Sequence, residues 1–149
     1  MDAEVYPDPA VEKMIRDTFL PVKIHVKQQP ETFAKFGDPW TPTIMIAEPD
    51  GTERHRFEGY LPAQDYIAQL RLGLAHAARA RGEWTDAERS YRALANDKQA
   101  GEVRPEALYW AGVSKYRGGD QSALADTARL FREMFPESNW AKKASVWES

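Results

Sequence analysis

The sequence predicts an α/β fold for residues 1–80 and an all-helical region for residues 81–149. Three observations lead to this prediction. Apolar and polar side chains alternate over residues 22–26, and a second apolar run at residues 43–47 precedes a Pro-Asp-Gly turn; both patterns are typical of strands. From Pro62 onward, apolar residues recur with helical spacing instead.

The first three predicted elements are a helix, a strand and a short helix. Asp8 can cap a helix that Pro9 begins, and four apolar residues then share one face: Val11, Met14, Ile15 and Phe19. Residues 22–26 follow as a strand with one apolar face. Pro30 begins the short helix, and Gly37 ends it.

Two further strands are predicted around the turn at residues 48–51. Residues 43–47 form a strand that is apolar on both faces, so we expect it to be buried on both faces. Residues 52–59 return antiparallel to it. His55 and Phe57 lie on one face of that strand and charged residues on the other, which indicates an edge strand.

The remainder is predicted to be helical. A long helix runs from Pro62 to Arg81, and Thr85 with Glu88 forms a capping box for the next helix. The later helices are marked by Pro105, Gly118-Gly119, Pro136 and the predicted N-cap Ser138.

These helices contain an internal repeat. Five residue pairs are each 37 positions apart: Ala75 and Gly112, Gly82 and Gly119, Ala87 and Leu124, Tyr91 and Ala128, and Leu94 and Phe131. The spacing resembles the tetratricopeptide repeat, a helical hairpin of about 34 residues. Two positions depart from that family, because Arg71 stands where a tryptophan is usual and Leu124 where a small residue is usual.

Residues 20–78 resemble the C-terminal half of the thioredoxin family. Six features carry the resemblance, in this order: Gln29-Pro30, Lys35-Phe36-Gly37, Trp40-Thr41-Pro42-Thr43, the turn at Gly51, Gly59, and the helix from Pro62. Residues 1–20 resemble the end of the long helix that follows the redox motif of that family.

The resemblance implies a peptide-binding groove at Trp40, Thr41 and Pro42. It implies that Pro42 follows a cis peptide bond, which redirects the chain sharply. The backbone of Thr41 would then face a groove and pair with an extended peptide by strand addition. Trp40 would form one wall of this groove.

The chain departs from the family where the redox chemistry takes place. It has no cysteine, which excludes disulfides, thiolate zinc sites, iron–sulfur clusters and a dithiol redox centre. The family's central strand, which carries the Cys-x-x-Cys turn and lies between the strands at 22–26 and 43–47, would precede Met1. We therefore expect these two strands not to pair as neighbours, and to leave an exposed edge, a repacked sheet or a strand shared with another chain.

Two interpretations stay open. The favoured one is a truncated product or a late-start reading frame, so that the chain is the C-terminal portion of a thioredoxin-family thiol–disulfide oxidoreductase and is redox-inactive as it stands. The alternative is a genuine cysteine-free variant. Such a variant would be a non-enzymatic protein-interaction module that uses the Thr41-Pro42 groove and the face of the helical repeats.

The charge and composition of the chain limit the classes of molecule that it is expected to bind. The net charge is −3, and neither part of the chain is basic enough to predict nucleic-acid or membrane binding. Without a signal peptide in these residues we expect a cytoplasmic protein, although a missing N-terminus would carry any signal. The predicted partners are proteins or peptides, with self-association through strand edges as a further route.

No cofactor or metal ion is expected. His25, His55 and His76 lack metal-ligand spacing, and His25 and His55 read as solvent-facing strand residues. Four arginines are expected on a solvated helical face or, alternatively, against an acidic peptide: Arg79, Arg81, Arg89 and Arg92. Trp84 and the pair Tyr109-Trp110 are expected to pack between helices, with binding on a concave repeat face as the alternative.

Overall fold

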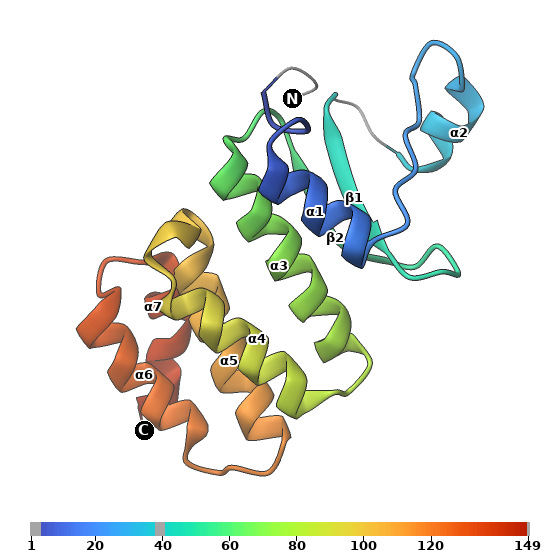
Figure 1. Ribbon diagram of the computed structural model, residues 1–149. Helices are drawn as coiled ribbons and strands as arrows, with labels where there is room; N and C mark the ends of the chain where they lie inside the picture. Colours follow the sequence, from blue (N-terminus) through green and yellow to red (C-terminus); the bar gives the residue numbers. More distant parts are fainter. Residues whose placement is uncertain (1–3, 38–40, 149) are drawn as a thin grey trace.

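The computed structural model describes residues 4–37 and 41–148 and shows a small sheet joined to a larger group of helices. Helix α3 (Ala63–Ala80) runs between the two parts (Figure 1). The sheet and α1 (Pro9–Thr18) lie on one side of α3, and the later helices lie on the other. This arrangement confirms a mixed α/β architecture with a helical C-terminal region.

The two N-terminal helices form as predicted. The Asp8 carboxylate accepts hydrogen bonds from the backbone N–H groups of Ala10 (2.9 Å) and Val11 (3.3 Å), and so caps α1. Helix α2 (Pro30–Lys35) begins at its proline. Gly37, two residues beyond α2, has a φ of 66°, a conformation that favours glycine.

The sheet has two antiparallel strands, β1 (Thr43–Ala47) and β2 (Glu53–Glu58). The antiparallel return is confirmed, and Phe57 is buried as the alternation of β2 predicted. Burial of β1 on both faces is wrong, because Ile46 alone is buried in that strand. Helix α3 packs on the face that carries Ile46, so the opposite face, which carries Met45, is only partly buried.

The predicted strand at residues 22–26 is wrong. These residues form no regular element, and the side chains of Leu20 and Val22 are 91% and 76% exposed. A strand needs a neighbour that pairs with its backbone, and the described part of the chain places none beside this segment. The expectation that residues 22–26 and 43–47 would not pair is confirmed for the described residues.

Helix α3 contributes to two apolar clusters. The first joins Tyr66 and Leu70 of α3 to Val11 of α1, Ile46 and Phe57 of the sheet, and Val5, which precedes α1. The second lies among the later helices and takes four residues from α3: Ala68, Leu72, Ala75 and Ala78. Helix α3 therefore packs against both cores, with different side chains buried in each.

The later helices follow one another as packed neighbours. They are α4 (Trp84–Asn96), η1 (Lys98–Val103), α5 (Arg104–Arg117), α6 (Ala123–Met134), α7 (Asn139–Ala144) and η2 (Ser145–Glu148). The Ser138 hydroxyl accepts a hydrogen bond from Trp140 N at 3.0 Å and caps α7, as predicted. The capping box at Thr85 and Glu88 is wrong, because α4 already begins at Trp84, and its N-cap, Glu83, makes no side-chain cap.

The residues used to detect the repeat occupy similar environments. Gly82 follows α3 and Gly119 follows α5, each with a positive φ angle, of 74° and 115° respectively. A Cβ atom on Gly112 would lie only 2.3 Å from Thr127 Oγ1, which is too close for the two atoms to pack. Glycine at this position therefore permits the close approach of α5 and α6. The tetratricopeptide-like assignment itself and the boundary at residue 80 stay predictions.

Candidate functional site

The predicted peptide-binding residues lie at the start of β1. The Thr41–Pro42 peptide bond is cis. Thr41 is exposed and Pro42 is half-buried. Trp40, the predicted groove wall, lies outside the described residues. The Pro42 carbonyl accepts a hydrogen bond from Gly59 N at 2.8 Å, which extends the β1–β2 ladder to the end of the sheet.

The register of the sheet sets the direction of each backbone group in β1. Opposite residues in an antiparallel pair alternate between pairs that exchange hydrogen bonds and pairs that do not. Because Gly59 N bonds Pro42 O, the exchanging pairs are Ile44 with Phe57 and Ile46 with His55. Met45, opposite Arg56, therefore directs its N–H and C=O away from β2, toward the outer edge of β1.

The face of the sheet opposite α3 is crossed by one arginine. Arg56 Nη2 donates a hydrogen bond to the Phe36 carbonyl at 2.9 Å and lies 3.6 Å from Met45 Sδ. Its Nε also donates to Glu53 Oε1 at 2.6 Å. Arg56 thus ties the end of α2 to the sheet beside the outer edge of β1.

A second group of polar side chains joins the sheet to the helices. His55 Nε2 lies 2.7 Å from Gln69 Oε1, and the rings of His55 and His76 are 5.3 Å apart. His76 Nδ1 lies 2.5 Å from the Tyr91 hydroxyl, and His76 Nε2 lies 3.5 Å from Glu106 Oε1. These contacts are compatible when Tyr91 donates to Nδ1 and Nε2–H points toward Glu106.

The surroundings shift the pKa values of this group in defined directions. Burial lowers the pKa of His55 below its ordinary value, and the hydrogen bond with Gln69 compensates only in part. Burial alone would raise the pKa of Glu106, but its hydrogen bond with His76 and the two histidine charges hold that pKa below the ordinary value. The expectation of a solvent-facing His55 is wrong, because its strand packs this face against α3.

Aromatic side chains gather on α5, α7 and η2. Tyr109 stacks on Trp147 with ring centroids 4.6 Å apart and lies 5.1 Å from Trp140. Trp110 lies 6.3 Å from Trp140. Two cations cover these rings, with Arg79 3.9 Å above Trp110 and Lys143 3.9 Å above Trp140. The expectation that Arg79 is simply solvated is wrong, since Arg79 Nε also donates to Tyr91 at 3.1 Å.

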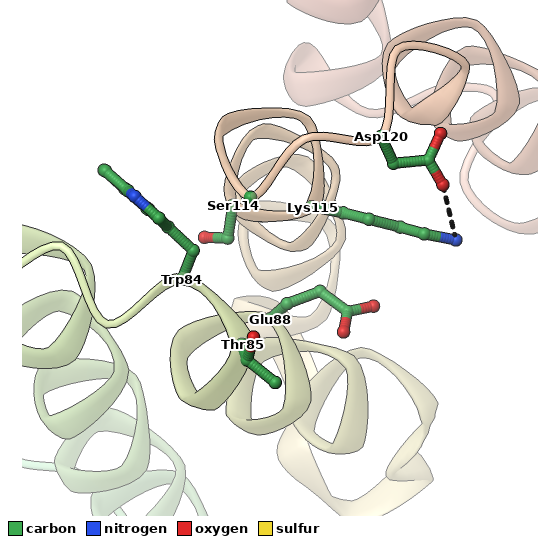
Figure 2. Close-up of a pocket in the computed structure, with 7 residues that line it drawn as sticks. Trp84, Thr85, Glu88, Ser114, Lys115 and Asp120 are labelled. Carbon is green, nitrogen blue, oxygen red and sulfur yellow. Dashed lines mark ion pairs between the residues drawn. The ribbon is translucent and has the colours of Figure 1, made fainter.

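A small pocket lies between the start of α4 and the end of α5. Its volume is about 160 Å³, and Figure 2 shows the residues that line it. Lys115 reaches Asp120 at 3.4 Å, and Glu88 is held by Arg92 at 2.7 Å. The Ser114 hydroxyl is buried and has no hydrogen-bond partner among the described residues. The pocket offers charges of both signs and no convergent set of donors.

The described residues hold no cluster of three or more histidine and carboxylate side chains that would suit a metal ion. No helix in the described ranges has the length and apolarity needed to cross a membrane. Since the sequence also lacks cysteine, it provides no attacking thiolate for disulfide exchange.

Comparison with known proteins identifies one relationship. Residues 1–73 match the family model of a thioredoxin-like domain. The match includes α1, α2, the sheet and α3 as far as Gly73, so it extends to the N-terminal helix as well as the motif at Thr41-Pro42. It suggests a thioredoxin-family relationship for this part of the chain. No match to the chain was found among curated proteins or among solved structures.

Sequence reasoning missed the polar group that joins the sheet to the helices. His76, Tyr91 and Glu106 lie far apart in the sequence and belong to three different helices. The usable signal was His76 itself, which lies among alanines in a segment predicted to be a helix. A histidine at such a position needs a polar partner from another element.

Proposed function

We propose that this chain is the peptide-binding C-terminal portion of a thioredoxin-family thiol–disulfide oxidoreductase. Its residues hold an extended peptide along β1 and leave the thiol chemistry to a cysteine that they do not contain. The observation that carries the proposal is the outward direction of the Met45 backbone groups at the edge of β1. The match of residues 1–73 to a thioredoxin-like domain supports the family relationship.

The peptide would add to the sheet as a third strand. Strand addition satisfies backbone groups at the edge and needs no particular side-chain sequence in the peptide. Thr41 is exposed directly before β1, so it would contact the end of the added strand. Trp40 and Pro42 would shape the groove at this end. A second copy of the chain can use the same edge, which would produce self-association.

A substitution at Met45 tests this geometry. Proline removes the backbone N–H and is tolerated at a strand edge, whereas leucine keeps both the N–H and the side-chain volume. We expect Met45→Pro to reduce binding of an eight-residue peptide that alternates valine and threonine by about tenfold or more, a loss of about 1.4 kcal/mol. Met45→Leu should bind as the unaltered chain does.

Binding can be followed by NMR titration, with circular dichroism confirming that both variants are folded. Equal affinity of the two variants, or shifts confined to the helices, would overturn binding at β1. Size-exclusion chromatography of the same variants tests self-association, which Met45→Pro should also reduce.

The link to an oxidoreductase has a separate test. An in-frame Cys-x-x-Cys within about a dozen codons upstream of Met1 supports it, since the family's helix separates that motif from residues like those of α1 by only a few turns. A stop codon followed by a ribosome-binding site directly before Met1 contradicts it. That outcome would favour the second candidate function.

The second candidate is a protein-interaction module that uses the helical face, read as tetratricopeptide-like hairpins. The half-exposed aromatic group with Arg79 and Lys143 above it supports this candidate. An acidic ten-residue peptide should bind there, and Lys143→Glu should weaken binding several-fold while Lys98→Glu, in η1, should not. Fluorescence of the tryptophans reports the binding, and an unchanged affinity in Lys143→Glu would exclude this surface.

A further inference from the structure

Helix α3 and the sheet meet at a residue with no side chain. A Cβ atom on Gly73 would lie 2.1 Å from Ile46 Cδ1 and 3.2 Å from His55 Cβ. Ile46 and His55 are opposite each other in the β1–β2 register. The His55 side chain therefore leaves the sheet at a close contact with α3, where a change in its charge acts directly on that contact.

Charged and titratable groups face this histidine from each element around it. Glu53 on β2 and Glu106 on α5 favour its protonated form, and His76 on α3 opposes it. Arg79 on α3 and Tyr91 on α4 contact the far side of the same group, where Arg79 Nε donates to the tyrosine hydroxyl. Protonation of His55 would thus add a second positive charge to a polar group that already contains the charged guanidinium of Arg79.

The hydrogen bonds around His55 leave few acceptors that could stabilise a second proton on its ring. Its Nε2 already donates to Gln69 Oε1, and Glu106, the carboxylate on the helices that favours its protonated form, also contacts His76. The ring also packs against Phe57, with centroids 5.9 Å apart. Burial, the largest influence, lowers the pKa of His55, and so favours the neutral ring while the sheet stays on α3.

We propose that His55 is a pH-sensitive latch between the sheet and helix α3. Protonation of its ring at mildly acidic pH weakens the contact at Gly73, and the sheet separates from α3 while the helices that follow stay folded. Because the sheet contains the edge of β1, acidification also changes the position of that edge. The latch does not depend on what β1 binds.

Amide hydrogen exchange of the full chain, measured by NMR at pH 7.5 and 5.5, tests the latch. We expect protection factors of β1 and β2 to fall by up to about tenfold relative to those of α4 and α5 between these two pH values, because His55 has its ordinary pKa of 6.5 in the open form and a lower pKa in the closed form. His55→Phe keeps a ring that cannot be protonated, so its sheet should lose no protection. His25→Phe is the matched control and should behave as the unaltered chain, because His25 lies in an exposed turn.

An equal loss of sheet protection in His55→Phe and in the unaltered chain would overturn the proposal. If His55→Phe does not fold, NMR titration of the unaltered chain decides instead. The ring protons of His55 should titrate below the ordinary value of 6.5, and the sheet should lose protection as the pH falls from 6.5 toward that midpoint. A midpoint at or above 6.5, or a sheet whose protection does not follow it, would also overturn the proposal.

Discussion

Tyr91 shows how much one buried hydroxyl can matter in this chain. It is fully buried, and its oxygen lies 2.5 Å from His76 Nδ1 and 3.1 Å from Arg79 Nε. Tyr91→Phe keeps the ring and leaves the histidine nitrogen without its partner, which costs about 1–3 kcal/mol for a buried group. We expect urea denaturation at pH 7 to show this loss, whereas Tyr116→Phe, at an exposed position, should unfold as the unaltered chain does.

Tyr91→Phe should also differ from the unaltered chain in how its stability depends on alkaline pH. Burial raises the pKa of Tyr91 to about 12, from an ordinary value of 10.0. The unfolded chain therefore loses this proton first, and the stability that Tyr91 contributes is present below pH 10 and decreases as the pH rises toward 12. Tyr91→Phe should lack this part of the alkaline decrease. Parallel stability curves for both proteins above pH 10 would contradict the assignment.

The role of a single residue could be predicted from the sequence where its contacts are local, and could not where they depend on the packing of other elements. Asp8 and Ser138 cap helices as predicted, because a cap depends on neighbours within three positions. His55 has the predicted face in its strand, yet its burial depends on α3 crossing that face at Gly73. The partners of His76 come from two helices whose packing no local pattern describes.

At the scale of elements, helix ends give a direct comparison between a cap that forms and one that does not. Asp8 accepts bonds from two N–H groups of α1, whereas Thr85 lies exposed within the first turn of α4. Asp8→Ala should lower the free energy of unfolding by about 1 kcal/mol, and Thr85→Ala should change it by less than about 0.5 kcal/mol.

Chemical denaturation followed by circular dichroism measures both changes. Hydrogen exchange in α1 is the local readout, since fraying of this helix would expose Val11 and reduce protection there first. A larger loss of unfolding free energy in Thr85→Ala than in Asp8→Ala would mean that Thr85 does cap α4.

Helices were easier to predict than strands for a physical reason. The backbone hydrogen bonds of a helix lie within the segment, so the prolines, glycines and caps of α1, α2, α5 and α7 were sufficient to locate them. The alternation at residues 22–26 is as regular as that of any strand in the chain. It still yields no strand, because pairing requires a partner that the described residues do not place there.

At the scale of the whole molecule, α3 links the two parts through packing and charge. Its buried residues belong to both apolar clusters. Arg81, which follows α3, donates to Glu48 at 2.8 Å, and Glu48 also accepts from Arg54 of β2 at 3.2 Å. A division at residue 80 therefore passes through an interface that both parts need.

Two fragments test this dependence. Residues 60–149 keep α3, whose Leu72 and Ala75 pack in one cluster with Tyr91 and Leu94 of α4. Residues 81–149 lack it and would expose those apolar surfaces of α4 to water, at a cost of about 25 cal/mol for each Å². We expect a cooperative urea transition for the longer fragment and a weak, non-cooperative one for the shorter. If the shorter fragment unfolds cooperatively with native helix content, α3 belongs to the N-terminal part alone, and the boundary at residue 80 separates two independent folding units.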